Sequence, residues 1–502
     1  MRIISTDLKF IVISSVLLLL SGCVTQRSIQ EDIRQAHEEA YYDWQREREL
    51  SADSVAGEQS LTVNDASKNE TQPVITGELR LEDALKLALL YNRDLEQVVE
   101  EKEFAEGQIL SAYGNVLPTV SVSGTYRRLE DVNAFEVGGN RIQLGALDNY
   151  SATLSVTQPL FDGGSLGAGL RAAKYYKALA DENIQARAEQ TIYQTQSLYL
   201  QSLLLQEQFN VSKERVELSK AALEDVQNQQ KFGTASEYNV LRAKVDLANA
   251  RTQMININNS LEQALSQLFI TMGVSQQSKI TLGDSLSYEP ADWDEEKAIH
   301  TALLNRPDLA GSKLMVELQE ESVKSSYSSY FPTVNAFFDN TWGKPNPIVQ
   351  TQNEWGRIWN AGISLNWPIF SLNREGAIKQ QKSALRQQQI SYLSMREQVL
   401  FEVHSAILAL ENTREAVEAQ ELTLDQAREG LRLAKAQFEE GTIGQVALLD
   451  AQQSLTEAQF NYFSSLHDHA LARLDLNRAT GQLTVKVSEE AKRSIPVLRQ
   501  NN

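Results

Sequence analysis

The chain has 502 residues, 42% of them hydrophobic, and a formal net charge of −19. Its length allows a large core, while its acidic balance argues against a nucleic acid partner, which would require clustered cations. Cys23 is the single cysteine, so a disulfide framework is excluded.

Residues 1–22 are predicted to be a lipoprotein signal peptide. Arg2 and Lys9 precede the apolar run 10–20, which is too short for a stable transmembrane anchor. The run ends in Leu-Ser-Gly before Cys23, which looks like a bacterial lipobox. Cys23 is therefore predicted to become the lipid-modified N-terminus. The alternative is an ordinary secretion signal with an incidental thiol.

Residues 23–78 are predicted to be a lipid-anchored N-terminal extension. Residues 29–50 could form a mostly polar amphipathic helix. Residues 51–76 are predicted to be a solvated linker, because they have little apolar content to bury. The extension would tether the lipid at Cys23 to the body of the protein.

The remainder of the chain is a tandem duplication. Short motifs recur in the same order at an offset of 214 residues at the first proline pair and 208 at both glycine pairs. We predict a first repeat over residues 79–294, a second over residues 295–482 and a tail over residues 483–502. The matched segments are 92–95 with 305–309, 117–120 with 331–334, 158–161 with 367–370, 231–234 with 439–442, and 272–273 with 480–481.

Near the prolines of each repeat, apolar residues alternate with small polar ones, apart from Phe337. A soluble, half-buried sheet is the simple explanation, but its polar face would be rich in Lys and Glu rather than Ser, Thr and Asn. The pattern is typical of transmembrane β-barrel strands. The predicted strands are 119–127, 151–157, 333–339 and 361–367, in hairpins 118–160 and 332–370.

Four strands cannot close a barrel, because the smallest barrels close at about eight strands. Open sheet edges inside lipid would leave backbone groups unpaired. The strand number therefore predicts that several chains share one barrel.

Long helices are predicted between the strand pairs, since no proline lies between Pro159 and Pro290 or between Pro368 and Pro496. Apolar residues spaced seven apart indicate coiled-coil packing. We expect long helix pairs over 163–272 and 372–480, and one shorter continuous helix before each strand pair, over 80–115 and 295–330. The seven-residue pattern comprises Val403, Leu410, Val417, Leu424, Leu431 and Phe438, and Phe209, Val216 and Leu223 in the first repeat.

Over residues 79–482 the chain resembles the TolC-family outer membrane efflux proteins. The resemblance is carried by the order and duplication of weak motifs, which are 81–85, 92–95, 117–118, 158–164, the two Gly-Thr turns, Gly273 and Gly481. It implies a mainly α fold with a β-barrel portion. A long coiled-coil α-helical barrel and four transmembrane strands per protomer would close, in a homotrimer, into a 12-stranded barrel.

The resemblance implies a passive conduit in the outer membrane, lipid-anchored, whose helical tunnel extends into the periplasm. It would export small molecules delivered by a periplasmic adaptor protein and an inner-membrane pump of RND or ABC type. The alternatives are the exit duct of a type I protein secretion system or a lipid-anchored periplasmic coiled-coil scaffold. No enzymatic activity, cofactor or metal is expected, and His467 and His469 are interpreted as surface positions.

The resemblance places two turns, Gly233-Thr234 and Gly441-Thr442, at the periplasmic tip, where a gate is expected. Asp450, nine residues after the second turn glycine, matches the family's acidic gate position, whereas Ala447 and Asn239 depart from it. A threefold ring of Asp450 could repel itself, bind a cation or respond to pH. Arg242 could pair with an acid of a neighbouring helix to hold the tip shut. A solvated helix residue is the alternative for Asp450.

Overall fold

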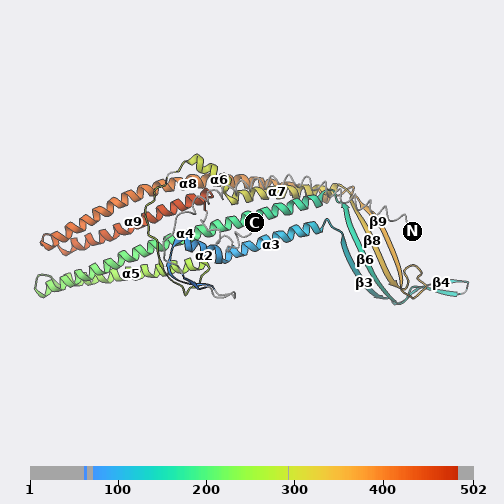
Figure 1. Ribbon diagram of the computed structural model, residues 1–502, viewed down its shortest axis with the longest axis horizontal. Coiled ribbons are helices and arrows are strands. Elements are labelled where there is room, and N and C mark those ends of the chain that lie inside the picture. Colours follow the sequence, from blue (N-terminus) through green and yellow to red (C-terminus); the bar gives the residue numbers. More distant parts are fainter. Residues whose placement is uncertain (1–61, 65–71, 139, 292, 484–502) are drawn as a thin grey trace. The chain divides into compact units, whose positions relative to one another are not determined.

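The computed structural model describes residues 62–64, 72–138, 140–291 and 293–483. The predicted signal peptide, Cys23 and the predicted helix at 29–50 lie outside these described residues, as does the tail from residue 484. In the described part, each repeat supplies two strands of one sheet and a pair of long helices (Figure 1). The predicted class of fold, mainly helical with a β portion, is confirmed.

Two long helical hairpins dominate the described chain. The first consists of α4 (Ser165–Lys231) and α5 (Glu237–Met272), and the second of α8 (Leu372–Glu439) and α9 (Gln445–Ala479). The longer helix of each pair spans roughly 100 Å at 1.5 Å per residue. Among the described residues, no helix has both the length and the apolarity to cross a lipid bilayer.

Burial along α8 confirms the seven-residue spacing. Val403, Leu410, Val417, Leu424 and Leu431 are all buried, and Phe438 is half-buried near the end of the helix. In the first repeat, Val216 packs with Leu247 and Ala250 of α5, so the stripe forms the seam between the two helices of a hairpin.

The predicted continuous helices 80–115 and 295–330 are wrong, because each is broken once. In the first repeat the break at Asn92 separates α2 (Leu81–Tyr91) from α3 (Arg93–Gly114). In the second, Arg306 separates α6 (Glu295–Asn305) from α7 (Pro307–Tyr327), which continues into the 3₁₀ turn η1 (Ser328–Tyr330).

Each break receives the C-terminal end of the shorter hairpin helix of the same repeat, and we call this contact a joint. In the first joint, the Asn92 side-chain amide donates to the Thr271 carbonyl oxygen at 2.8 Å, and its side-chain oxygen accepts from the Leu95 backbone at 2.9 Å. Gly273 has a φ of +70°, and a Cβ there would lie 1.9 Å from the Tyr91 carbonyl oxygen. Only glycine fits this approach.

The second joint uses charge. The Arg306 guanidinium contacts the Asp308 carboxylate at 2.6 Å, the Glu402 carboxylate of α8, and the Ala479 carbonyl oxygen at 3.4 Å. A Cβ added to Gly481 would lie 3.0 Å from the Asn305 carbonyl carbon, which is a looser approach than at Gly273. The matched Asn-Arg motifs and glycines of the two repeats are therefore parts of structural joints.

The four predicted strands form one antiparallel sheet in the order β3-β6-β8-β9. They are β3 (Thr119–Arg128), β6 (Asp148–Phe161), β8 (Thr333–Lys344) and β9 (Gly356–Asn366). The register places Val122, Leu154 and Trp359 on one face and Ser121, Ser155 and Asn360 on the other. The apolar face is exposed on the outer strands, where Val122 is 75% and Ile363 70% accessible.

Phe337, the exception in the alternation, lies on the polar face opposite Gly362. A Cβ at Gly362 would stand 2.9 Å from the end of the Phe337 ring. The ring therefore covers the neighbouring strand at a position without a side chain, and the break in the pattern reflects cross-strand packing rather than a change of face.

Two sheets were not predicted. One is a ribbon of β4 (Asn133–Val137) and β5 (Asn140–Leu144). The other has the order β1 (Thr62–Asn64), β2 (Val74–Leu79), β7 (Lys279–Leu282), with β2 and β7 parallel.

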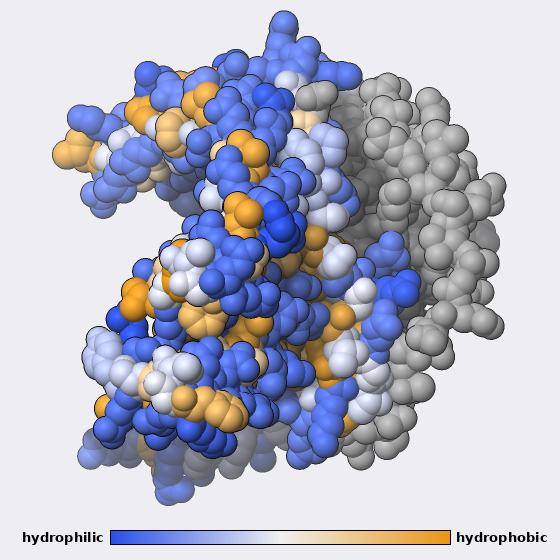
Figure 2. Space-filling model, turned by 90° about the vertical axis from the view of Figure 1, so that its left-hand side faces the viewer, coloured by the Kyte–Doolittle hydropathy of each residue, from blue (hydrophilic) through white to orange (hydrophobic). Residues whose placement is uncertain are grey.

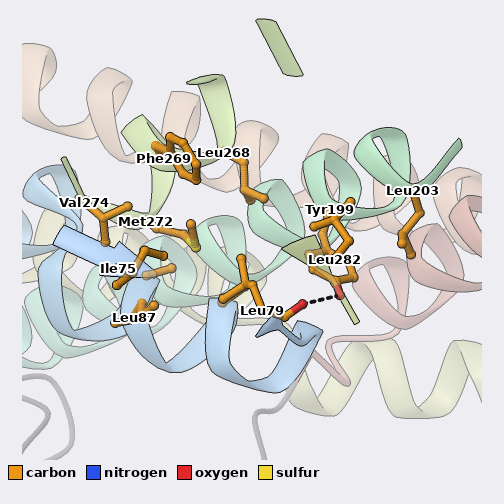
Figure 3. Close-up of a cluster of buried hydrophobic side chains, with 12 residues drawn as sticks. Ile75, Leu79, Leu87, Tyr199, Leu203, Leu268, Phe269, Met272, Val274 and Leu282 are labelled. Atoms are coloured by element: carbon orange, nitrogen blue, oxygen red, sulfur yellow. Dashed lines mark hydrogen bonds between the residues drawn. The ribbon is translucent and has the colours of Figure 1, made fainter. Parts of the chain in front are cut away.

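The predicted solvated linker 51–76 is therefore wrong at its C-terminal end. Ile75 and Leu79 of β2 are fully buried in a cluster with Tyr199, Leu268 and Met272 (Figure 3). The Tyr199 hydroxyl donates to the Leu79 carbonyl oxygen at 3.0 Å. The strand after the linker thus anchors the chain to the long helices.

Candidate functional site

The predicted tip turns close the two helical hairpins with the same backbone geometry. Gly233 and Gly441 have φ angles of +75° and +74°. The threonine after each glycine donates its backbone N–H and its hydroxyl to the same carbonyl oxygen, that of Gln229 or Gln437, each at 2.9 Å. These bonds satisfy carbonyl groups left free at the ends of α4 and α8.

A Cβ at either turn glycine would meet no neighbouring atom within 4 Å. Glycine is therefore needed here for the left-handed backbone alone. Seen from the hairpin ends, the surface is mostly hydrophilic, with separate hydrophobic patches, and is hollowed on one side (Figure 2).

After the turns the two hairpins differ. The Ser236 hydroxyl caps α5 by accepting from the Asn239 backbone at 3.3 Å, whereas Gly444 before α9 offers no side-chain cap. The hairpins touch here, since the buried Gln445 amide lies 3.4 Å from the Asn239 carbonyl oxygen. The side-chain oxygen of Gln445, Oε1, is buried without a hydrogen-bond partner in the described chain.

The predicted gate residues occupy matching positions, each nine residues after its turn glycine. Asp450 is exposed and Arg242 is half-buried. Within the described chain neither forms an ion pair, so the expected pairing of Arg242 with a neighbouring acid is not made inside one protomer. Ala447 is exposed, and Asn239 contributes its backbone rather than a carboxylate.

A buried polar cluster, not predicted from the sequence, ties the hairpins together further from the turns. The Arg215 guanidinium of α4 contacts the Asp246 carboxylate of α5 at 2.6 Å and the Gln452 side-chain oxygen of α9 at 3.0 Å. The Ser219 hydroxyl donates to the other oxygen of Asp246 at 2.7 Å. Arg215 is 5% exposed, so an unpaired charge here would be strongly unfavourable.

A weak sequence signal for this cluster existed. Ser212 and Ser219, seven residues apart, lie among the apolar positions of α4 and are both buried. Small polar residues inside a coiled-coil seam leave room for a long polar side chain. The partners Asp246 and Gln452 could not be identified, because no sequence spacing links residues on three different helices.

The interpretation of His467 and His469 as surface positions is wrong, since they are 7% and 2% exposed. The His469 ring lies beside Tyr288, and its Nε2 is 3.1 Å from the Glu289 carbonyl oxygen. His469 therefore holds the segment before α6 against α9. Among the described residues, no group of three or more His, Cys, Asp or Glu could hold a metal ion.

The family model described as outer membrane efflux protein matches residues 84–274 and 298–482. The chain is 22% identical to the alkaline protease secretion protein AprF of Pseudomonas aeruginosa, over 81% of this chain and 85% of that protein. It is also 22% identical to the toluene efflux pump outer membrane protein TtgF of Pseudomonas putida, over 80% of this chain and 83% of that protein.

Solved structures with a similar fold include two outer membrane channels. The Campylobacter jejuni CmeC channel aligns with a TM-score of 0.71 and 18% identity, over 88% of this chain and 97% of that chain. The open state of the Neisseria gonorrhoeae MtrE channel aligns with a TM-score of 0.68 and 20% identity, over 87% and 98%.

Proposed function

Because the chain belongs to the outer membrane efflux protein family, we propose that it is the outer membrane channel of a tripartite efflux system. It acts as a passive conduit through which small molecules, such as drugs and toxic compounds, leave the cell. The observation that carries this function is the division of the described chain. A sheet with one exposed apolar face lies beyond one end of the long helices, and two hairpin turns lie at their other end (Figure 1).

The sheet supports a homotrimer. In the described chain β3 pairs only with β6 and β9 only with β8, so both outer strands have a free edge. Free edges are not tolerated in lipid. Three copies of the four-stranded sheet, with β3 of one beside β9 of the next, form a closed barrel of twelve strands.

The helices support the same assembly. Besides its buried stripe, α8 carries a second, exposed apolar stripe with Phe401, Leu408 and Leu422 at multiples of seven residues. α5 exposes Leu241 and Val245, which are 53% and 59% accessible. α5 packs on α4, and α8 packs on α7 and α9, so these stripes are free to join neighbouring protomers.

We assign the protein to the outer membrane, with the helical tunnel in the periplasm. The lipid would be attached at Cys23 after removal of residues 1–22, and residues 23–78 would link it to the channel. The partners are a periplasmic adaptor and an inner-membrane pump of RND or ABC type. The relative named as an alkaline protease secretion protein keeps polypeptide export as the second candidate function.

The gate is assigned to Asp450 and Arg242. In the proposed trimer, their equal distance from the turn glycines would put three carboxylates and three guanidinium groups at one level of the tunnel. Neither group is paired within the described chain, which leaves both available to neighbouring protomers. Pairs between protomers would hold the tunnel narrow.

Planar-bilayer recording of purified protein tests this function. We expect detergent-stable trimers with a small conductance, and a larger conductance for Asp450→Ala and Arg242→Ala. Asp450→Asn keeps the volume of the side chain and separates charge from size. Failure to form trimers, or the absence of a pore in the wild type and in every variant, would exclude the channel.

A further inference from the structure

The two hairpin ends repeat one backbone but carry opposite charge. Residues 228–244, around Gly233, contain three cations (Lys231, Arg242, Lys244) and one anion (Glu237), a net charge of +2. The matching residues 436–452, around Gly441, contain three anions (Glu439, Glu440, Asp450) and no cation, a net charge of −3. The matching hydrogen bonds of the turns show that this difference is not a consequence of different backbones.

The contrast is sharpest in the two residues before each turn glycine. Lys231 and Phe232 in the first hairpin stand where Glu439 and Glu440 stand in the second. All four side chains are exposed, and Phe232 is 84% accessible. The Lys231 ammonium lies 3.2 Å from the Asn228 side-chain oxygen, and within the described chain none of the three charges has an ion-pair partner.

We propose that the two hairpin ends are two different docking sites for the periplasmic adaptor. The end of α4–α5 binds an acidic surface with an apolar contact for Phe232, and the end of α8–α9 binds a basic surface. The proposal rests on the proposed function, which supplies the adaptor as the partner. It implies that an adaptor that binds every hairpin end must carry both an acidic and a basic surface.

The threefold symmetry of the proposed trimer determines which contacts the adaptor subunits can make. Around a threefold axis, cationic and anionic ends alternate, so identical adaptor subunits cannot make the same contact at neighbouring ends. A single exposed charge pair has little effect alone. An adaptor assembly that engages three equivalent ends at once sums three such pairs, which changes its affinity roughly tenfold, with a strong dependence on salt.

The duplication supplies a matched control. One variant, Lys231→Glu/Phe232→Glu, makes all ends anionic. A second, Glu439→Lys/Glu440→Phe, puts a Lys-Phe dipeptide at every end and changes the net charge of residues 436–452 from −3 to 0. The four substitutions together exchange the two dipeptides, which restores the alternation of Lys-Phe and Glu-Glu in a ring turned by one hairpin. Because these side chains are exposed and the turn bonds are made by backbone groups and by the threonine hydroxyls, each variant keeps the turn.

The test uses the full-length protein in lipid nanodiscs and two labelled helical-hairpin peptides. The peptides are identical except for two Glu or two Lys at their turns. Fluorescence anisotropy at low and high salt should show that the first variant loses roughly two- to fivefold in affinity for the Glu peptide, because a single-hairpin peptide contacts one end at a time. The second should lose as much for the Lys peptide, and the exchange variant should bind both like the wild type.

Equal binding of both peptides to all four proteins would overturn the proposal, and so would losses that do not depend on salt. Bilayer conductance of the same samples distinguishes a failure of the docking proposal from a failure of the channel function. If all four proteins conduct and the peptides do not discriminate, the docking proposal fails while the channel stands. If conductance changes in the single-end variants without any change in peptide binding, the charges act between protomers and the docking proposal is again wrong.

Discussion

The first and second joints hold equivalent helices together by different means. At the first, the backbone of Gly273 is pressed against the Tyr91 carbonyl group, and a neutral amide from Asn92 completes the contact. At the second, Gly481 has more room, and the Arg306 guanidinium reaches the end of α9 while it pairs with two carboxylates.

The difference shows what the duplication preserves. Both repeats keep a broken helix and a glycine of positive φ where the hairpin helix returns. The chemistry of the contact is free to change, from close packing in one copy to ion pairing in the other. We therefore expect the two repeats to respond differently to matched substitutions.

The largest contrast is expected between Gly273→Ala and Gly481→Ala. At Gly273 the added methyl group meets backbone at 1.9 Å and the residue keeps a positive φ, so we expect a loss of about 3–5 kcal/mol in the free energy of unfolding. Gly481→Ala should lose about 1–3 kcal/mol, because its nearest neighbour is at 3.0 Å. Chemical denaturation in detergent measures both.

Gly233→Ala is the control, since it has the positive φ without a neighbour and should lose only about 1–2 kcal/mol. Equal losses at Gly273 and Gly481 would mean that the two joints are equally tight, contrary to their geometry.

Arg215→Met should have the next largest effect. The substitution keeps the length of the side chain but leaves the Asp246 carboxylate, 21% exposed, without its cation. We expect a loss of about 2–4 kcal/mol. The position equivalent to Arg215 in the second hairpin is Thr423, which is exposed, so Thr423→Ala should change stability by less than about 0.5 kcal/mol.

Pairing Arg215→Met with Asp246→Leu should recover most of the loss, because no buried charge then remains unpaired. Denaturation midpoints of the single and double variants measure the coupling. A double variant as unstable as Arg215→Met alone would show that packing, not charge, holds the hairpins together there.

The smallest effect is expected from pH. Burial raises the pKa of Glu182 to about 7, with a further rise from Asp181. Burial likewise raises the pKa of Glu189 to about 7. Both lie on α4, and the Cβ of Glu182 is 4.0 Å from the place where a Cβ on Gly311 of α7 would stand. Because the folded protein favours the protonated form of both acids, they stabilise it. Their contribution to the free energy of unfolding is fully present below about pH 4.5 and is lost as the pH rises through 7.

Each acid should account for about 1–2 kcal/mol of lost stability between pH 5 and pH 8. Glu182→Gln and Glu189→Gln should flatten this dependence in thermal unfolding, while Glu214→Gln on the exposed face of α4 should leave it unchanged. A slope that survives both substitutions would place the titrating groups elsewhere.

Sequence periodicity predicted those elements whose residues contact neighbours at a regular spacing. The stripe from Val403 to Leu431 and the alternation in β3 and β9 are of this kind. The helix breaks were missed although their signals were present. Asn92 is a good N-cap residue three positions before Leu95, and Pro307 stands at the first position of α7.

Other features depend on contacts between residues distant in the chain. Ile75 is buried in a cluster that includes Leu282 of β7, some two hundred residues away, and six residues of strand do not reveal such a partner. At the candidate site, the turns and the matching positions of Arg242 and Asp450 could be predicted from the motifs. The cluster around Arg215 could not, because it depends on how three helices meet.

Each joint also closes within its own half of the polypeptide. Tyr91 and Gly273 both precede α6, and Asn305 and Gly481 both follow α5. The first half can therefore form its joint before the second half is available, since it needs no residue beyond Gly273 to do so. A chain synthesised from its N-terminus can in this way complete one repeat as a folding unit and present α4 as a surface on which α7 and α9 of the second then assemble.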